Sequence, residues 1–358
     1  MVDGLIVSTP GRICLFGEHQ DYLHLPVIPA AISLRLKIEA KQNRDREIRI
    51  DLPDISSHDS FSLRTPLQYT KPADYFKSVI NVLYRHAFSF SRGLDGIVTS
   101  NIPIQAGTSS SSALVVSWVH LLALMSDQGT ALTKEDIARY AYEAEVLEFS
   151  GAGGMMDQYS TALGGIIAID FFPELKVEPI MAVPGTFVLG DSQEPKDTQG
   201  ILSRVKYGVL EILENLSGTN SGFSLYAETA ESISRYRGRL PDSQFNLLAG
   251  TVRNHDITKQ ARKLFAQQPL DHRSFGELLS AHHAILRDVQ KISTPKIDRM
   301  LDAAMNAGAY GGKINGSGGG GCMFAYSPEH PDKVAEAIDR AGGKSYIVSL
   351  DDGTRVER

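Results

Sequence analysis

The chain has 358 residues, of which 42% are apolar and 22% charged, and its formal net charge is −6. This length allows two domains or one large one. The acidic balance argues against nucleic-acid binding, which needs a concentrated basic surface. Cys14 and Cys322 are the only cysteines. They are too few for a disulfide framework or a cysteine-based metal site, which favours a reducing cytosol.

The N-terminal segment, MVDGLIVSTPGR, lacks the charged start and long apolar stretch of a signal peptide. The most apolar helix candidate, residues 113–125, is short and is interrupted by Ser117 and His120. It therefore predicts a core helix and not a membrane span. We expect a cytoplasmic protein, monomeric or homodimeric, that binds neither nucleic acid nor membrane.

Apolar patterning predicts strands mixed with helices in the first half of the chain. The expected strands are 5–9, 13–16, 34–40, 47–52, 96–102, 164–171 and 186–189. The expected helices are 73–88, 113–125 and a third that starts at the T-K-E-D capping box of Thr133 and runs to about residue 149.

From about residue 200 the pattern becomes helical, and the chain ends in a strand-rich segment. The expected helices are 201–216, 224–236, 243–265, 274–289 and 296–307, the last opened by Thr294 and Pro295. A strand–loop–strand unit at 311–326 precedes a helix at 333–342 and a strand at 344–350. These elements predict a mixed α+β protein with domains at 1–190 and 191–358.

The run QAGTSSSSAL, residues 105–114, places small hydroxyl residues directly before an apolar helix. The first turn of a helix has unpaired N–H groups and a partial positive charge, and small side chains allow a phosphate to approach them. The run is not a Walker motif. A flexible linker or a simply capped helix start is the alternative, and the apolar segments on both sides disfavour the linker.

Two other stretches are rich in glycine or polar groups. GSGGGGC at 316–322 has five glycines in seven positions, which fits backbone lying against a ligand or, alternatively, a tight hairpin. GEHQDY at 17–22 follows Arg12 and gathers two carboxylates, a histidine and a tyrosine. It is either a solvated loop or a turn suited to a polyhydroxylated ligand.

Together, in this order, the three stretches resemble those of the GHMP kinase superfamily, which includes galactokinase, homoserine kinase and mevalonate kinase. GRICLFGEHQDYLHLPVIPAAI is similar to the galactokinase signature, and its Asp21 and Tyr22 favour a sugar over mevalonate. PIQAGTSSSSAL resembles the family's phosphate loop and GGKINGSGGGGC its closing motif. The resemblance implies an N-terminal domain with a ribosomal-protein-S5-like fold and a C-terminal ferredoxin-like α/β-plait domain.

The segment AEVLEFSGAGGMMDQYS, 144–160, resembles a galactokinase segment with a magnesium-binding glutamate twelve residues before a catalytic aspartate. Glu145 and Asp157 have this separation. Without this resemblance, the favoured interpretation of Glu145 is a solvated helix residue and that of Asp157 a helix-start carboxylate. The resemblance implies that Asp157 accepts the proton of the attacking hydroxyl, while Arg12 stabilises the developing alkoxide and keeps Asp157 ionised.

The remaining site assignments also come from the resemblance, which implies ATP and Mg²⁺ as cofactors. Residues expected at the nucleotide are Gly107, Thr108, Ser109, Ser110, Ser111 and Ser112, with Lys77 from the segment ADYFKSVI. Ser111 and Glu145 are expected to bind Mg²⁺, with Ser110 as the alternative serine. Residues expected at the substrate are Glu18, His19, Asp21, Asp157, Gly318 and Gly319.

The implied activity is transfer of the ATP γ-phosphoryl group to the anomeric hydroxyl of a galactose-like sugar, which gives a sugar 1-phosphate. Leu23, His24 and Leu25 replace the usual Asn-Gly-Gly, and 189–200 lacks the usual sugar-contacting tyrosine. Arabinose, a uronic acid or an N-acetylhexosamine are therefore also candidates. His24 and Lys196 either read such a substituent or are solvated.

Two other functions are open. One is a kinase for another acceptor of this superfamily, such as mevalonate. The other is a catalytically silent sugar sensor, which would be expected to lose part of the serine loop or the catalytic base.

Overall fold

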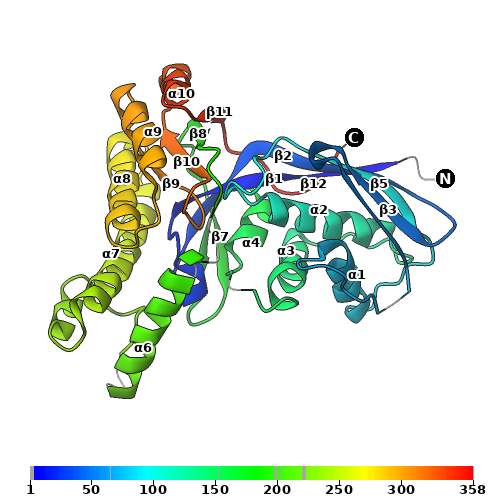
Figure 1. Cartoon of the computed structure of the whole chain (residues 1–358), viewed down its shortest axis with the longest axis horizontal. Helices are drawn as coiled ribbons and strands as arrows, with labels where there is room; N and C mark the ends of the chain where they lie inside the picture. Colours follow the sequence, from blue (N-terminus) through cyan, green and yellow to red (C-terminus); the bar gives the residue numbers. More distant parts are fainter. Residues whose placement is uncertain are drawn as a thin grey trace.

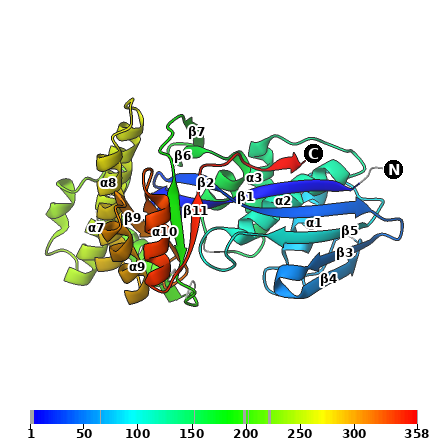
Figure 2. The same cartoon turned by 90° about the horizontal axis from the view of Figure 1, so that it is seen from above.

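The chain was analysed as a computed structural model that describes residues 4–64, 66–151, 153–196, 200–201, 203–219 and 223–357. Two sheets, of eight and four strands, follow one another along the long axis of the molecule (Figure 1). Figure 2 shows the larger sheet from above, with helices behind it, and the smaller sheet next to a group of helices.

The larger sheet has the strand order β12-β1-β2-β5-β3-β4, and β6 pairs with β2 and β7. Its pairs are antiparallel apart from the parallel pair of β3 and β5. The strands are β1 (Leu5–Phe16), β2 (Ile28–Gln42), β3 (Glu47–Leu52), β4 (Ser57–Ser62), β5 (Leu94–Ser100), β6 (Ile166–Asp170), β7 (Lys176–Ile180) and β12 (Arg355–Glu357). The helices of this part are α1 (Tyr75–Arg85), α2 (Ser110–Met125), α3 (Lys134–Tyr142) and α4 (Met156–Leu163).

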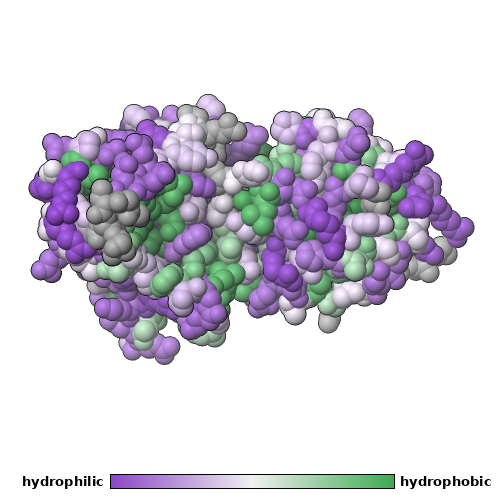
Figure 3. All heavy atoms as spheres, turned by 90° about the horizontal axis from the view of Figure 1, so that it is seen from below, coloured by the Kyte–Doolittle hydropathy of each residue, from purple (hydrophilic) through white to green (hydrophobic). Residues whose placement is uncertain are grey.

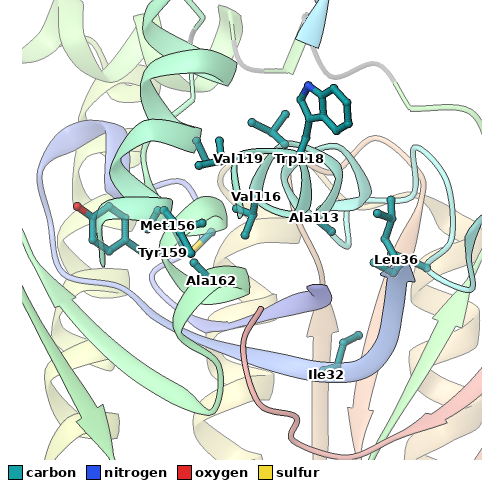
Figure 4. Packing of buried hydrophobic residues seen from close by; sticks show 14 of the residues in the cluster. Ile32, Leu36, Ala113, Val116, Trp118, Val119, Met156, Tyr159 and Ala162 are labelled. Carbon is teal, nitrogen blue, oxygen red and sulfur yellow. The ribbon is translucent and has the colours of Figure 1, made fainter. Parts of the chain in front are cut away.

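Helix α2 is the centre of this part of the molecule. It is apolar on most sides because it packs against β1 and β2 as well as α1, α3 and α4. Figure 4 shows Val116 and Val119 of this helix near Met156 and Tyr159 of α4. Trp118 is buried, and its indole N–H donates to the carbonyl of Phe76, 3.1 Å away. This packing fixes the serine-rich start of α2 in place.

The smaller sheet is antiparallel and has the order β11-β8-β10-β9. Its strands are β8 (Phe187–Asp191), β9 (Gly311–Ile314), β10 (Cys322–Tyr326) and β11 (Lys344–Val348). The helices of this part are α6 (Gly208–Thr219), α7 (Asp242–Phe265), α8 (His272–Asp288), α9 (Pro295–Asn306) and α10 (Pro331–Arg340). Numbered within the sheet the order is 4-1-3-2, which confirms the predicted ferredoxin-like arrangement.

Several predicted elements differ from the observed ones. The strands 5–9 and 13–16 are one strand, β1, and the helix expected to reach 149 ends at Tyr142, followed by one π-helical turn, η3 (Glu143–Leu147). The helix predicted at 224–236 is wrong: only a 3₁₀ turn, η5 (Ser232–Tyr236), forms there. Thr229 and Ser232 exchange side-chain-to-backbone hydrogen bonds in the manner of a capping box, which opens this turn after residue 229 and not at 224. The polar edge strand β4, β7, β12 and α4 were not predicted.

The membership of the sheets bears on the expected division at residue 190, which falls inside β8. Strand β8 lies in the smaller sheet, whereas the C-terminal strand β12 pairs with β1 in the larger one. We propose a division in which residues 187–348 form the second unit and the last residues return to the first. One hydrophobic cluster spans both, and within it Phe16 at the end of β1 stacks edge-on against Phe275, with ring centroids 5.7 Å apart.

In the part of the chain that the structure describes, no helix has the length and apolarity needed to cross a bilayer. The face drawn in Figure 3 is hydrophilic over its two ends, with apolar patches between them.

Candidate active site

A cavity of about 460 Å³ opens where the two units meet. Its walls come from β1, the loop that leads into α2, the turn η3, the start of α4 and the loop after β9. The predicted residues that line it are Arg12, Glu18, His19, Asp21, Gly107, Ser109, Ser110, Ser111, Ser112, Glu145 and Asp157. The fold thus brings together residues that are far apart in the sequence.

Arg12 and Asp157 form an ion pair in this cavity. Nε and Nη2 of Arg12 lie 2.9 and 2.8 Å from the same oxygen, Oδ1 of Asp157. Burial lowers the pKa of Arg12, but the charges of Asp157 and Glu18 more than offset it and raise the pKa. Asp157 is in the first turn of α4, where the helix dipole favours a carboxylate. The buried guanidinium of Arg12 and the part-exposed carboxylate of Asp157 therefore lie side by side in the cavity wall.

The phosphate loop lies directly on β1. The N–H of Arg12 donates to the carbonyl of Thr108 at 3.1 Å. A Cβ on Gly11 would be 2.8 Å from that same oxygen, so glycine is required for this approach. Gly107 has φ +86°, a left-handed conformation, and a Cβ there would meet the carbonyl of Asn315 at 2.7 Å. These two glycines let three chain segments converge.

The start of α2 fits an anionic group. Ser109, at the N-cap position, makes no side-chain capping bond, and its Oγ is buried without a hydrogen-bond partner. The N–H groups of the first turn are therefore not capped by this side chain, and the small side chains of Ser109–Ser112 leave the cavity open beside them. This arrangement suits the phosphates of a nucleotide.

Glu145 lies beside the serines that were predicted to share a metal ion with it. Burial raises the pKa of Glu145, while the side chains of Gln158, Ser111 and Ser112 lower it in part. The amide of Gln158 donates to Oε2 of Glu145 at 2.6 Å. Within the described residues no group of three or more His, Cys, Asp or Glu side chains forms a metal cluster. One carboxylate and a hydroxyl suit Mg²⁺, which keeps several waters and binds nucleotide phosphates.

Sequence reasoning missed two residues that hold the site together. Lys313 is fully buried, and its ammonium lies 2.9 Å from Oε2 of Glu18, which also accepts the N–H of Gly316. Asn315 donates to the carbonyl of Gly107 and accepts from the N–H of Cys14, both at 2.8 Å. Both residues stand in the quoted GGKINGSGGGGC motif, but only its glycines were assigned a role.

His19 and Asp21 lie in the segment after β1, residues 17–25, which is called the substrate loop here because residues in it were predicted to bind the substrate. The side chain of His19 is held by hydrogen bonds, and that of Asp21 lines the cavity. Both ring nitrogens of His19 form hydrogen bonds with the protein. Nε2 is 3.0 Å from the carbonyl of Ser317, and Nδ1 is 2.7 Å from the hydroxyl of Tyr22. A carbonyl can only accept, so Nε2 donates and Nδ1 accepts. Burial and the nearby charge of Asp157 raise the pKa of Asp21 to about 6.

Four predicted residues do not line the cavity. Lys77 is buried, and its ammonium is 3.0 Å from Asp74 and 2.7 Å from the hydroxyl of Thr70. Thr108 is fully buried, and its hydroxyl donates to the carbonyl of Pro103 at 3.3 Å. Gly318 and Gly319 pack against Ile292 instead, to whose carbonyl the N–H of Gly319 donates. Gly316 and Ser317 occupy the corresponding wall of the cavity.

The departure at Leu23, His24 and Leu25 does not reach the cavity. Leu25 is buried in a third hydrophobic cluster formed with α6, η5 and α7. His24 is exposed and stacks on Phe171, with ring centroids 6.4 Å apart. Lys196, by contrast, lines the cavity beside Gly107, and burial lowers its pKa. The segment beyond it, 197–199, lies outside the described residues.

Comparison with known proteins places the chain among kinases of one family. Residues 74–165 match the GHMP kinases N terminal domain, 261–344 the GHMP kinases C terminal, and 2–41 the galactokinase galactose-binding signature. A mevalonate kinase of Pyrococcus furiosus is 30% identical over 99% of this chain and 98% of its own length. A galactokinase of Actinobacillus succinogenes is 28% identical over 96% of this chain and 89% of its own.

Solved structures show the same fold. The galactokinase of Lactococcus lactis complexed with galactose superimposes with a TM-score of 0.86 at 21% identity, covering 99% of this chain and 95% of that one. The mevalonate kinase of Methanococcus jannaschii gives 0.75 at 20% identity, covering 98% and 99%.

Fold and site together define a small-molecule kinase, an ATP-dependent phosphotransferase. The chain belongs to the GHMP kinase family, and its two-domain fold and galactokinase-like signature confirm the predicted resemblance.

Proposed function

We propose that this kinase transfers the γ-phosphoryl group of ATP to the anomeric hydroxyl of a galactose-like monosaccharide and releases a sugar 1-phosphate. The observation that carries the proposal is Asp21, a carboxylate in the cavity close enough to Asp157 for the two charges to interact. Neighbouring carboxylates provide several acceptors for hydroxyl groups but repel a second anion. This pocket therefore suits a neutral polyhydroxylated substrate.

In the proposed reaction, an oxygen–phosphorus bond forms between the sugar hydroxyl and the γ-phosphorus. The bond from that phosphorus to the bridging oxygen of ADP breaks. Arg12 contacts Oδ1 of Asp157, which leaves Oδ2 to hold the hydroxyl and take its proton. The guanidinium stabilises the negative charge that develops on the attacking oxygen.

The start of α2 would position the nucleotide phosphates, with Ser109 Oγ and the first-turn N–H groups as donors. When bound, Mg²⁺ would neutralise phosphate charge, and Ser111 and Glu145 are the residues we assign to it. Lys196 lies beside Gly107 in the cavity and would add a positive charge next to the phosphates.

Mevalonate is the second candidate acceptor, favoured by the 30% identity to the Pyrococcus furiosus enzyme along the whole chain. Mevalonate carries a carboxylate, and Lys196 is the cation in the cavity that could pair with it. Against it, the carboxylate of Asp21 lies in the same cavity and would repel the carboxylate of mevalonate.

The test is ADP release from MgATP with a panel of acceptors: galactose, arabinose, N-acetylgalactosamine, galacturonate and mevalonate. A sugar should give the highest kcat/KM. Mevalonate as the best acceptor would contradict the proposal. Binding of a sugar without ADP release would point to the silent sensor instead.

A further inference from the structure

A second cavity, of about 650 Å³, lies in the helical part of the molecule and shares no lining residue with the first. It is bounded by the segment around η5, by one side of α7 and by the end of α8 (Figure 1 shows α7 and α8 side by side). Nothing in the proposed kinase reaction uses it.

The lining combines apolar side chains with three cations. Ile233, Phe245, Leu247 and Val289 supply the apolar surface, and Arg237, Arg253 and Lys291 supply the charge. The single acidic lining residue, Asp288, is paired with Arg287 at 2.8 Å.

Within the described part of the chain the three cations have few partners, although the charge of Lys291 acts on Asp288 of the same lining and lowers its pKa. Among the described residues the structure records no ion pair and no side-chain hydrogen bond for Arg237, Arg253 or Lys291. The guanidinium of Arg237 lies over the ring of Phe245, 4.5 Å from its centroid. All three are exposed side chains around one concavity, and their combined positive charge would attract an anion to it. In a chain of net charge −6 this local excess is not a consequence of overall composition.

The walls of the cavity are held by contacts that do not involve these cations. The guanidinium of Arg204 donates to the carbonyls of Gln290 and Lys291 at 2.6 and 2.9 Å, which holds the segment that follows α8. Gly250 lets α7 pack closely on α8, because a Cβ there would lie 2.8 Å from Val289 Cγ1. The cavity is therefore preformed, as ligand sites usually are.

We propose that this cavity is a binding site for a small organic anion, a phosphate or carboxylate with an apolar portion. The acidic group would contact Arg253, Arg237 and Lys291, and the apolar portion would cover Phe245 and Leu247. Ile233 and Phe245 also belong to the hydrophobic cluster that anchors Leu25 of the substrate loop. This ligand would therefore contact the same packed cluster as that loop.

The experiment is calorimetric titration of the full chain with octyl phosphate and with octanoate, below their micelle-forming concentrations. Saturating MgADP is present so that the phosphate loop is occupied. Inorganic phosphate tests for a site that needs only charge, and neutral octyl glucoside tests for one that needs only apolar contact. The measurement requires no phosphoryl acceptor, so it is independent of the proposed function.

We expect saturable binding of octyl phosphate or octanoate that Arg253→Ala and Arg237→Ala each weaken about fivefold or more. Asn246→Trp, which fills the cavity from an exposed position of α7, should abolish it. Arg273→Ala, an exposed arginine of α8 outside both cavities, is the matched control and should not change it. The proposal is overturned by an absence of binding, by equal binding of octyl glucoside or inorganic phosphate, or by affinities that these three cavity variants do not alter.

Discussion

Arg12 directs two nitrogens at a single oxygen of Asp157: Nε and Nη2 lie 2.9 and 2.8 Å from Oδ1. The guanidinium is also tied to the phosphate loop through the carbonyl of Gly107. One side chain thus connects the predicted base to the loop that would hold the phosphates. Catalysis in such a site depends on positioning, so both members of the pair should be sensitive to change.

Replacing either member should abolish turnover while the fold persists. Asp157→Ala removes the proton acceptor, and Arg12→Ala removes the positive charge next to the attacking oxygen, so kcat should fall about a thousandfold or more. Steady-state ADP release measures this, with circular dichroism as the check on folding. Asp302→Ala, an exposed aspartate of α9, is the control. Near-normal activity of either site variant would refute the assignment.

The magnesium assignment rests on Glu145 beside Ser111. Glu145→Gln keeps the shape of the side chain but removes its charge, so the Mg²⁺ concentration for half-maximal activity should rise about tenfold. Because burial raises the pKa of Glu145, lowering the pH should raise the Mg²⁺ requirement of the unaltered protein, and less so that of the variant. Glu135→Gln, exposed on α3, is the control. An unchanged Mg²⁺ dependence of Glu145→Gln would remove Glu145 from the metal site.

The carboxylate of Asp21 is expected to lower the stability of the fold at neutral pH and to strengthen binding of the sugar. Its pKa rises from 3.8 to about 6 on folding, so the native state binds a proton more tightly than the unfolded state does. The cost of the ionised carboxylate is absent below pH 4 and complete above pH 6. Asp21→Asn should therefore stabilise the protein at pH 7–8 by roughly 1–3 kcal/mol, and this gain should disappear as the pH falls to 4.

Thermal unfolding from pH 4 to pH 8 measures the gain, with Asp302→Asn as a control that should show none. The same variant should bind the sugar more weakly, because an amide lacks the second acceptor oxygen. A gain in stability that is constant from pH 4 to 8 would contradict the assigned burial of a charge.

The buried ion pair of Glu18 and Lys313 should stabilise the whole fold, in addition to holding the substrate loop in place. Burial raises the pKa of Glu18, but the charges of Lys313 and Arg12 lower it by a larger amount. The pKa of Glu18 is therefore below its usual value. Glu18→Gln would leave the buried ammonium uncompensated, at a cost of about 3–5 kcal/mol. The double variant Glu18→Gln/Lys313→Met should be less destabilised than Glu18→Gln alone by at least about 1 kcal/mol.

Urea unfolding gives these free energies, and Lys71→Met, in the exposed pair with Asp59, should change them little. Because the pKa of Glu18 is lowered, the stabilisation is present above pH about 4.5 and is lost as the pH falls through the lowered pKa. Strictly additive effects of the two substitutions would show that the pair does not interact.

The sequence alone predicted the second sheet and most helices, because their apolar periodicity is strong. It could not predict β12, whose three residues form a strand only by pairing with the distant β1. In the site, the hydroxyl and carboxylate residues were predictable from their motifs. Lys313 and Asn315 were not, since their roles depend on contacts with Glu18, Cys14 and Gly107 about 200–300 residues away. Lys77 differs from them, because its partners, Asp74 and Thr70, are local and it does not line the cavity.

At Leu23, His24 and Leu25 the sequence departs from the galactokinase motif, and this departure suggested an altered sugar pocket. The structure gives Leu25 a packing role and leaves His24 outside the cavity. The residues that would select the acceptor are therefore Asp21 and Lys196, one anion and one cation in the same cavity.

The central claim is that this site phosphorylates the anomeric oxygen of a sugar. Phosphorus–proton correlation NMR of the product formed from MgATP and the best acceptor tests it most directly. We predict a signal that couples the phosphorus to the anomeric proton, present with the unaltered protein and absent with Asp157→Ala. A phosphorus coupled to any other position of a sugar, or found on mevalonate, would contradict the account.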